Sequence, residues 1–265
     1  MIRSSDLQTV PEVRVPVSMR KVFVALPAYN EADRLGQLLE KISKTFADNQ
    51  LNYEIIVVDD GSSDATAEIA DSASKEFPVR LIKHERNLGL SGALNTGLRK
   101  AAGLGCSDDI IVTMDADDTH PPKIIDRLVR AIDEGCDISI ASRYQPGSRV
   151  VGVPWNRVLL TQFASYMFRI LMPIPGVRDY TCGYRAYKHE VLKATIDHYG
   201  EDFVSEKGFS CMVDVLLKMR RFKFVIGEVP FVLRYDLKEG ESKMPVGNTI
   251  WKTLLLFAKR RLSGY

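Results

Sequence analysis

Residues 109–122 read DIIVTMDADDTHPP, a stretch that predicts a buried strand ending in a turn of carboxylates. Its first half is apolar and β-branched, and the Pro-Pro pair at its end indicates that a helix follows. Asp115 and Asp117 stand two positions apart, so both can face one cation, and their oxygen ligands favour Mg²⁺ or Mn²⁺. A metal pair and ordinary turn residues are both open for these two aspartates, whereas we expect Asp118 or Thr119 to cap the helix.

The composition is that of a globular protein without a global charge bias. The chain has 265 residues, of which 45% are hydrophobic, enough to bury a substantial core. A net charge of +2 from 36 basic and 34 acidic residues gives no sign of a nucleic-acid partner. No apolar run reaches the roughly 18 residues of a membrane span, so any membrane contact should be peripheral.

The four cysteines are far apart and show no metal-ligand spacing. They are Cys106, Cys136, Cys182 and Cys211. This distribution suits a reducing compartment, and we expect all four to be small buried residues.

Strand and helix patterns alternate four times in the first half of the chain. Continuous apolar runs predict strands, and apolar residues at helical spacing predict a helix after each polar loop. The predicted strands are 22–26, 54–58, 79–83 and 110–113, and the predicted helices are 35–46, 65–75, 91–102 and 124–132. Four consecutive βα units predict an α/β fold with a doubly wound, mainly parallel sheet, in which ligands bind beyond the carboxyl ends of the strands.

The loops at that edge are rich in acidic residues and glycine. They read PAYNE at 27–31, DDGSSD at 59–64 and HERNLGLSG at 84–92. No G-x-G-x-x-G and no G-x-x-x-x-G-K-[ST] follows the first strand, which excludes two familiar phosphate-binding fingerprints. The loops instead favour a nucleotide whose diphosphate is held through a cation, although a tight turn with a helix cap explains 59–62 equally well.

An ordered set of motifs carries a resemblance to a known enzyme family. The motifs are VALPAYNE at 24–31, IVVDDGSSD at 56–64, NLG at 87–89, DAD at 115–117, ASRY at 141–144, WNR at 155–157, VRDYTCGYRAY at 177–187 and EVPF at 228–231, continuing to GESK at 240–243. The first four resemble the family 2 glycosyltransferases of the GT-A fold. The later ones are similar to the polyprenyl-phosphate sugar synthases, whose best-known members are the dolichyl-phosphate mannose synthases. The resemblance covers about residues 20–250.

The resemblance implies a metal-dependent, inverting transfer of a hexose from a nucleotide diphosphate sugar, of the GDP-mannose or UDP-glucose type, to dolichyl or undecaprenyl phosphate or a similar polyprenyl phosphate. By motif position, the nucleotide would be held by Pro27, Tyr29, Glu31, Asp59, Asp60 and Asp115. The Mg²⁺ or Mn²⁺ ligands would be Asp115, Asp117 and Thr119, which stands where the synthases often carry glutamine. The acceptor phosphate would be bound by Arg143, Arg157 and Thr161, and catalysis would use Asp117, Arg234 and Lys243.

The chemistry of such a transfer favours arginines on the acceptor side. A bound cation with Arg or Lys can stabilise the charge that develops on the leaving nucleotide. A phosphate monoester has a second pKa of about 6, so as an acceptor it needs cations rather than a base. No acidic residue lies between Arg143 and Asp179, a segment with four further arginines. We expect Arg143 and Arg157 to bind phosphate, and Arg149 and Arg169 to be solvated surface cations.

Other functions stay open on the residues alone. A sugar hydroxyl, as in polysaccharide or lipopolysaccharide synthesis, would need a base, and Asp214 is the candidate, although its place on an apolar helix also suits a structural role. A non-catalytic nucleotide-sugar-binding module is disfavoured by the joint presence of the metal motif, Arg234 and Lys243. The segment 235–239 is longer than in mannose synthases, which leaves the sugar open.

Two amphipathic segments, 155–172 and 250–265, suit either core packing or a membrane surface, and basic residues at the end of the second suit anionic lipid. We expect a peripheral protein on the cytoplasmic face of the membrane. The predicted organisation is a flexible arm at 1–18, one GT-A domain at 19–245 and an amphipathic basic helix at 246–265. The domain would have a nucleotide-binding half at 19–120 and an acceptor half at 121–245.

Overall fold

The computed structural model describes residues 20–208 and 210–237. The predicted arm at 1–18 and the predicted basic helix at 246–265 lie outside these residues. Across the described part of the chain, none of the helices is both long enough and apolar enough to cross a membrane.

A seven-stranded sheet forms the centre of the molecule, in the order β3-β2-β1-β4-β7-β5-β8. Its strands are β1 (Lys21–Ala28), β2 (Asn52–Asp59), β3 (Val79–Lys83), β4 (Ile110–Thr113), β5 (Ile138–Ser142), β7 (Arg185–Lys188) and β8 (Ile226–Pro230). The first four are parallel to one another and β8 is parallel to β5, whereas β7 runs antiparallel to both of its neighbours. The prediction of a mainly parallel α/β sheet is confirmed.

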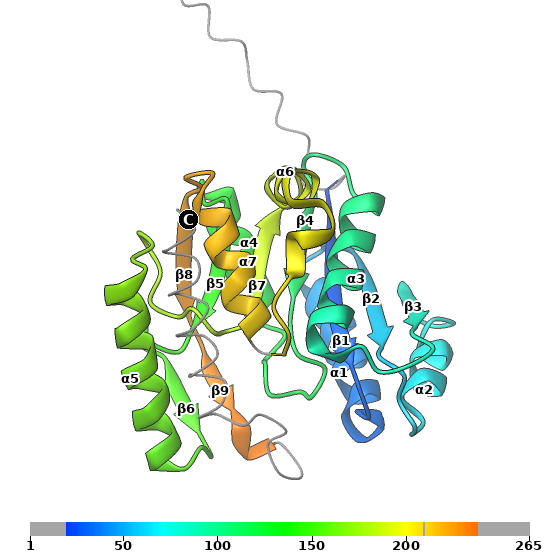
Figure 1. The fold of residues 1–265 in the computed structure, drawn as a ribbon. Coiled ribbons are helices and arrows are strands. Elements are labelled where there is room, and N and C mark those ends of the chain that lie inside the picture. The colour runs from blue at the N-terminus through cyan, green and yellow to red at the C-terminus, as the bar shows by residue number, and fades with distance from the viewer. Residues whose placement is uncertain (1–19, 209, 238–265) are drawn as a thin grey trace, which may run out of the picture.

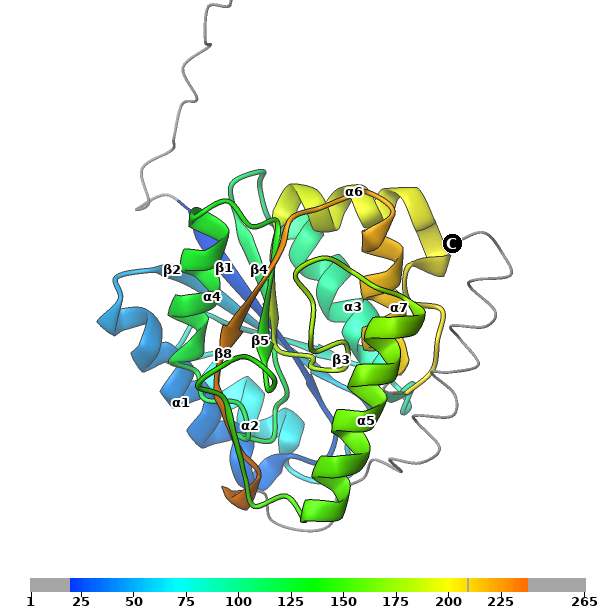
Figure 2. The same ribbon diagram turned by 90° about the vertical axis from the view of Figure 1, so that its left-hand side faces the viewer.

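Helices cover both faces of this sheet (Figures 1 and 2). They are α1 (Ala32–Asp48), α2 (Thr66–Ala73), α3 (Gly89–Leu104), α4 (Ile124–Asp133), α5 (Trp155–Leu171), α6 (His189–Tyr199) and α7 (Ser210–Arg220), with the short 3₁₀ helices η1 (Gly200–Val204) and η2 (Tyr235–Leu237). Figure 2 shows α1 and α4 on one face and α3, α6 and α7 on the other. The central strands carry continuous apolar runs because both of their faces are covered.

The strand register brings the predicted ligand-binding loops together. Pro27 and Ala28 at the end of β1 pair with Val58 and Asp59 at the end of β2. The last residue of β4 pairs with Ala25 of β1. The loops that follow these three parallel strands therefore leave the sheet at the same edge, which is where ligands bind in open α/β sheets.

A two-stranded sheet of β6 (Arg149–Val151) and β9 (Val232–Arg234) lies with α5 beyond the β8 edge (Figure 1). The turn after β6 allows η2 to pack closely against it. Gly152 has a φ of +82°, and a Cβ at this position would lie 2.5 Å from the backbone nitrogen of Asp236. Glycine is needed here both for its backbone conformation and for the close approach.

The start of α4 differs from the sequence expectation. The helix begins at Ile124 with Lys123 as its N-cap, and no side chain caps it. The expectation that Asp118 or Thr119 caps this helix is therefore wrong. A residue before proline is disfavoured in the helical conformation, so the Pro-Pro pair at 121–122 keeps the acidic turn separate from the helix.

The cysteines follow the expectation only in part. Cys182 and Cys211 are buried, Cys136 is partly buried, and Cys106 is exposed because it lies in the loop after α3. Burial raises the pKa of Cys182 and of Cys211 to about 12, which makes these thiols poor nucleophiles.

Candidate active site

The turn after β4 carries the two predicted metal ligands. Asp117 Oδ1 accepts hydrogen bonds from the hydroxyl of Thr119 at 2.7 Å and from its backbone N–H at 3.2 Å. Between them, Asp118 has a φ of +59°, a conformation that costs a side-chain-bearing residue on the order of 1–3 kcal/mol. The carboxylate of Asp118 forms an ion pair with Lys41 of α1, which holds the turn. Such strain, kept in place by the surrounding fold, is typical of functional sites.

His120 is hydrogen-bonded to the same turn. The backbone N–H of Asp115 donates to His120 Nδ1 at 3.2 Å, so the neutral ring carries its proton on Nε2. Nε2 lies 3.8 Å from Asp115 Oδ2. The ring is buried, stacks on Tyr184 with centroids 5.0 Å apart and contacts the ring of Phe231 edge-on. Sequence reasoning did not single out His120, although it stands only two residues after Asp118.

Strand β7 brings the acceptor half of the chain against Asp115. The hydroxyl of Thr113 donates to the carbonyl of Gly183 at 2.6 Å. A Cβ at Gly183 would lie 3.6 Å from Asp115 Oδ1 and 2.9 Å from Met212 Cε, so glycine permits this close approach. The side chain of Asp115 is nevertheless 40% exposed, so a ligand can reach its carboxylate.

Asn30 joins the first two loops. Its φ is +54°, its N–H donates to the hydroxyl of Ser62 at 2.9 Å, and its Oδ1 accepts from the N–H of Ser63 at 2.9 Å. The predicted nucleotide-binding residues Tyr29 and Glu31 flank Asn30, and Tyr29 is 39% exposed. These contacts fix both loops as one surface at the carboxyl edge of β1 and β2.

The two predicted nucleotide-binding aspartates of the second loop are both buried and hydrogen-bonded. The carboxylate of Asp60 lies 2.7 Å from His84 Nδ1 and accepts the backbone N–H groups of Leu88 and Gly89 at 2.9 and 2.8 Å. Its side chain is only 3% exposed, so Asp60 anchors the loop after β3 instead of facing solvent. Asp59 is buried as well and accepts a backbone N–H of its own turn at 3.1 Å.

Arg143 forms a two-pronged ion pair with Asp179. Its Nε and Nη2 donate to the two carboxylate oxygens at 2.8 and 2.7 Å, and Nη2 also donates to the hydroxyl of Thr181 at 2.6 Å. Burial by itself would lower the pKa of Arg143, but the charge and hydrogen bonds of Asp179 raise it well above its ordinary value. Arg143, the predicted phosphate-binding arginine, is thus ion-paired with Asp179, which lies 36 residues away in sequence.

The other predicted acceptor residues lie on α5. Arg157 belongs to the first turn of this helix, and its side chain lies outside the described part of the chain. Thr161 stands one turn later, and its carbonyl accepts a hydrogen bond from the hydroxyl of Tyr144 at 3.2 Å. Because Tyr144 directly follows Arg143, this bond links α5 to the Arg143 segment. The structure therefore places the three predicted acceptor residues in adjoining elements.

Arg234 lies beside the acidic turn. Its backbone N–H donates to the carbonyl of Thr119 at 3.3 Å, so the end of β9 follows the turn after β4. Its guanidinium binds the carboxylate of Asp236 through Nε at 2.9 Å and Nη2 at 2.8 Å. These hydrogen bonds and the negative charge of Asp236 raise the pKa of Arg234. Lys243, the remaining predicted catalytic residue, lies outside the described residues.

Asp214 is buried on α7. Its carboxylate accepts hydrogen bonds from Lys218 Nζ at 2.7 Å and from the hydroxyl of Ser205 at 3.0 Å. The side chains of Asp214 and Lys218 are 0% and 1% exposed. Lys218 also donates to the carbonyl of Phe203, so the pair ties α7 to η1. This environment identifies Asp214 as a stabilising residue.

The donor atoms of the acidic turn fit a hard cation that shares its coordination with a substrate. Among the described residues, no group of three or more Asp, Glu, His and Cys side chains is arranged to hold a metal ion. Asp115 and Asp117 would supply at most two carboxylates, the number with which proteins bind Mg²⁺ together with substrate phosphates. These two residues would hold the cation, with Thr119 fixing Asp117, and a cation bound there would stabilise negative charge on a leaving diphosphate.

Sequence comparison agrees with this geometry. Residues 23–196 match the model of Glycosyl transferase family 2. The chain is 37% identical over 235 residues to dolichol-phosphate mannosyltransferase of Pyrococcus furiosus, which covers 88% of this chain and 62% of that protein. It thus spans less than two thirds of that relative. It is 34% identical over 231 residues to polyprenol monophosphomannose synthase of Mycolicibacterium smegmatis (86% and 83% covered) and 34% identical over 228 residues to undecaprenyl-phosphate mannosyltransferase of Micrococcus luteus (86% and 88% covered).

Solved structures show the same fold at low sequence identity. Glucosyl-3-phosphoglycerate synthase from Mycobacterium tuberculosis, in complex with Mn²⁺, UDP and glucosyl-3-phosphoglycerate, superimposes with a TM-score of 0.64 at 20% identity over 92% of this chain and 80% of that chain. The same enzyme with Mg²⁺ and UDP gives a TM-score of 0.65 at 19% identity over the same shares of the two chains. The GT-A architecture is confirmed, and the chain belongs to glycosyltransferase family 2.

Proposed function

We propose that this protein transfers mannose from a nucleoside diphosphate mannose to a polyprenyl phosphate, with inversion at the anomeric carbon and with Mg²⁺ or Mn²⁺ as cofactor. The names of the three relatives support mannose as the sugar and a polyprenyl phosphate as the acceptor. The exposed carboxylate of Asp115, in the same turn as Asp117, supports a diphosphate donor held through a cation, and the backbone of Arg234 bonds this turn at Thr119.

The burial of Asp214 is the observation that carries the choice of acceptor. A sugar hydroxyl must lose a proton as it attacks, and the sequence offered Asp214 as the base for that step. Its carboxylate is fully buried and bonded to Lys218, out of reach of a substrate hydroxyl. A phosphate acceptor is already ionised near neutral pH and needs no base. The structure of this region therefore favours the phosphate acceptor over the hydroxyl acceptor.

In the proposed reaction an oxygen of the acceptor phosphate attacks the anomeric carbon from the face opposite the diphosphate. The new carbon–oxygen bond forms as the bond to the diphosphate breaks, and the nucleoside diphosphate leaves with its negative charge. We assign the acceptor phosphate to Arg157, Thr161 and the Nη1 edge of Arg143, because Asp179 and Thr181 occupy the Nε and Nη2 positions. Arg234 and Lys243 would stabilise charge on the leaving group.

The outward face of α5, defined here as Trp155, Leu159, Phe163, Tyr166 and Ile170, supports a location at the membrane surface. These side chains are 76%, 55%, 62%, 59% and 57% exposed, an unusually apolar face for one helix. Aromatic residues with aliphatic neighbours suit the headgroup boundary of a bilayer. We infer that α5 lies on the cytoplasmic face of the membrane beside the lipid acceptor.

Release of free nucleoside diphosphate tests the proposal. The enzyme is incubated with GDP-mannose or with UDP-sugars, with Mn²⁺ or a chelator, and with or without a short polyprenyl phosphate. We expect release that requires both GDP-mannose and the lipid phosphate and that stops with chelator. D117N should lower the rate by about 100-fold or more, because charge stabilisation at the leaving group contributes factors of this size. The control D197N changes an exposed carboxylate of α6 and should retain the rate.

Two other outcomes would replace the proposal. Release that requires a sugar hydroxyl instead of the lipid phosphate would establish the polysaccharide type of family 2 activity. Donor binding without release for any acceptor would establish a nucleotide-sugar-binding module.

A further inference from the structure

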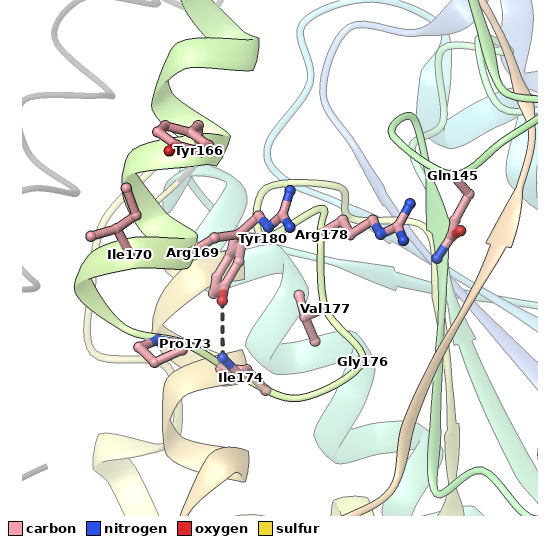
Figure 3. Close-up of a pocket in the computed structure, with 10 residues that line it drawn as sticks. All are labelled: Gln145, Tyr166, Arg169, Ile170, Pro173, Ile174, Gly176, Val177, Arg178 and Tyr180. Atoms are coloured by element: carbon pink, nitrogen blue, oxygen red, sulfur yellow. Dashed lines mark hydrogen bonds between the residues drawn. The ribbon is translucent and has the colours of Figure 1, made fainter.

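A cavity of about 520 Å³ lies between the C-terminal half of α5 and the segment 173–180 (Figure 3). Its lining combines two guanidinium groups and an amide with an apolar wall. The lining residues are Gln145, Tyr166, Arg169, Ile170, Pro173, Ile174, Gly176, Val177, Arg178 and Tyr180. Figure 3 shows the side chains of Arg169 and Arg178 extending toward Gln145, while Tyr166 and Ile170 lie on the α5 side.

The two arginines bring two positive charges to the cavity, and the carboxylate of Glu228 bonds its lining residues Gln145 and Arg178. Within the described ranges, no acidic side chain forms an ion pair with the guanidinium of Arg169 or Arg178. The acid at the rim is Glu228, and its oxygens already accept the backbone N–H of Arg178, that of Asp179, and the amide of Gln145. The hydroxyl of the lining residue Tyr180 is already hydrogen-bonded: it accepts the backbone N–H of Ile174 and donates to the carbonyl of Met172. Among the described residues, the guanidinium groups are the charged donors of the cavity that have no ion-pair partner, and such groups suit a phosphate.

The apolar wall of the cavity continues onto the outward face of α5. Tyr166 and Ile170 belong to both surfaces and are 59% and 57% exposed. A ligand that fills this cavity therefore meets cations at one end and an exposed apolar helix face at the other. Such a surface matches an amphiphile with a phosphate headgroup.

The cavity lies at the opposite end of α5 from Arg157 and adjoins the Arg143 segment through Gln145 and Arg178. Arg169 follows Arg157 by twelve residues on one helix, which corresponds to about 18 Å along its axis. A phosphate between Arg169 and Arg178 is therefore far from the part of the acceptor position that the N-terminal turn of α5 would form. The sequence alone indicated a solvated surface cation at Arg169, because it does not reveal that Arg178 converges with it.

We propose that this cavity binds the phosphate headgroup of an anionic membrane phospholipid, with Arg169 and Arg178 as its donors and the acyl chain along Tyr166 and Ile170. The bound lipid sets the depth and orientation of α5 in the membrane surface. The proposal does not depend on the transferase activity, since the binding needs neither donor nor acceptor.

Vesicle binding tests this site on the full chain without nucleotide sugar or polyprenyl phosphate. The vesicles are phosphatidylcholine alone or phosphatidylcholine mixed with phosphatidylglycerol, and the proteins are the wild type, R169Q, R178Q, the double variant and R149Q. Arg149 is an exposed arginine of β6 on the same side of the molecule and outside the cavity, so R149Q removes one charge and leaves the cavity intact. All three positions are exposed, so folding should be kept, which circular dichroism verifies.

We expect the wild type to prefer the phosphatidylglycerol vesicles. R169Q and R178Q should each weaken that binding by about 10-fold or more, as expected for loss of a charge-assisted hydrogen bond to phosphate. R149Q should weaken it by at most about 5-fold, the effect of one diffuse surface charge. Equal losses in R149Q and R169Q, or full binding by the double variant, would reduce the interaction to general electrostatic attraction and overturn the site. Tight binding of soluble glycerol 3-phosphate that displaces the vesicles would assign the cavity to a free phosphate ester and overturn the lipid assignment.

Discussion

The backbone N–H of Asp115 donates a hydrogen bond to Nδ1 of His120, and the opposite ring nitrogen faces the Asp115 carboxylate at 3.8 Å. One imidazole thus contacts both the main chain and the side chain of a candidate metal ligand. Stacking on Tyr184 fixes the ring, and the hydroxyl of Tyr184 in turn donates to the carbonyl of Pro121 at 3.1 Å. His120 is therefore a positioning residue for Asp115.

This relationship predicts that two substitutions of His120 differ in their effect on Mn²⁺ affinity. H120F keeps a ring against Tyr184 but removes the Nδ1 acceptor, so it should weaken Mn²⁺ binding in the presence of nucleoside diphosphate by about 10-fold, within the 1–3 kcal/mol cost of a lost buried partner. H120N loses the ring but can place an oxygen near the Nδ1 position, and it should recover most of the affinity. Electron paramagnetic resonance of free Mn²⁺ measures both. Equal weakening in the two variants would show that His120 acts through ring packing instead of its hydrogen bond.

The ion pair of Arg143 and Asp179 predicts an acid-sensitive part of the stability. Burial by itself would raise the pKa of Asp179, but the charge and hydrogen bonds of Arg143 lower it below the ordinary value. A carboxyl whose pKa is lower in the folded state stabilises the protein above its unfolded pKa of about 3.9. This contribution is fully present at neutral pH and is lost as the pH falls below about 4.

D179N should accordingly lower the free energy of unfolding by about 3–5 kcal/mol at neutral pH, because it leaves a buried guanidinium without its partner. The loss should shrink below about pH 4, where the wild-type carboxyl also becomes neutral. Urea denaturation across this pH range measures the difference. D126N removes the acid of an exposed ion pair on α4 and should cost at most about 1 kcal/mol. A pH-independent difference between wild type and D179N would contradict the prediction.

The buried pair of Asp214 and Lys218 predicts a loss of stability without a loss of chemistry. D214N should lower the free energy of unfolding by about 3–5 kcal/mol, because the ammonium group of Lys218 stays buried without its counter-ion. Turnover by the folded variant at low temperature should stay within about 10-fold of the wild type. D197N breaks the exposed Lys193–Asp197 pair at the same helical spacing and should be nearly neutral. A 100-fold loss of turnover in folded, donor-binding D214N would instead identify Asp214 as a general base.

The backbone of the third loop packs directly against Gly61 of the second loop, so a larger residue at position 61 should disturb both loops. Gly61 has a φ of +70°, and a Cβ there would lie 2.8 Å from the carbonyl carbon of Arg86 and 2.9 Å from the nitrogen of Asn87. G61A should therefore force the loops apart, with a cost of about 1–3 kcal/mol in stability and weaker donor binding. Gly103, in α3, has open space at the Cβ position, so G103A should instead stabilise the protein by about 0.5–1 kcal/mol. Thermal denaturation and nucleotide titration compare the two variants, and unchanged donor affinity in G61A would contradict the link.

The sequence by itself determined the order of βα units and the position of the acidic turn. The predicted strand at 79–83 coincides with β3, and the predicted strand at 110–113 coincides with β4. These features depend on hydrophobic periodicity and on turn residues within a few positions, which are local properties of the chain. The ordered motifs identified the family for the same reason, because each motif is a short contiguous stretch of the chain.

Tertiary structure alone decided which polar residues are exposed at the carboxyl edge of the sheet and which are buried in ion pairs and hydrogen bonds. The partner of Arg143 is 36 residues away, and the carboxylate of Asp60 is covered by backbone groups 28 and 29 residues further on. The insertion of antiparallel β7 between β4 and β5 brings Gly183 against Asp115. Burial and ion pairing depend on contacts between segments that are distant in sequence, and local patterns contain no information on those contacts. The same reason explains why Asp214, a possible base by its sequence, is buried in an ion pair with Lys218, whereas Arg169 and Arg178 line one cavity.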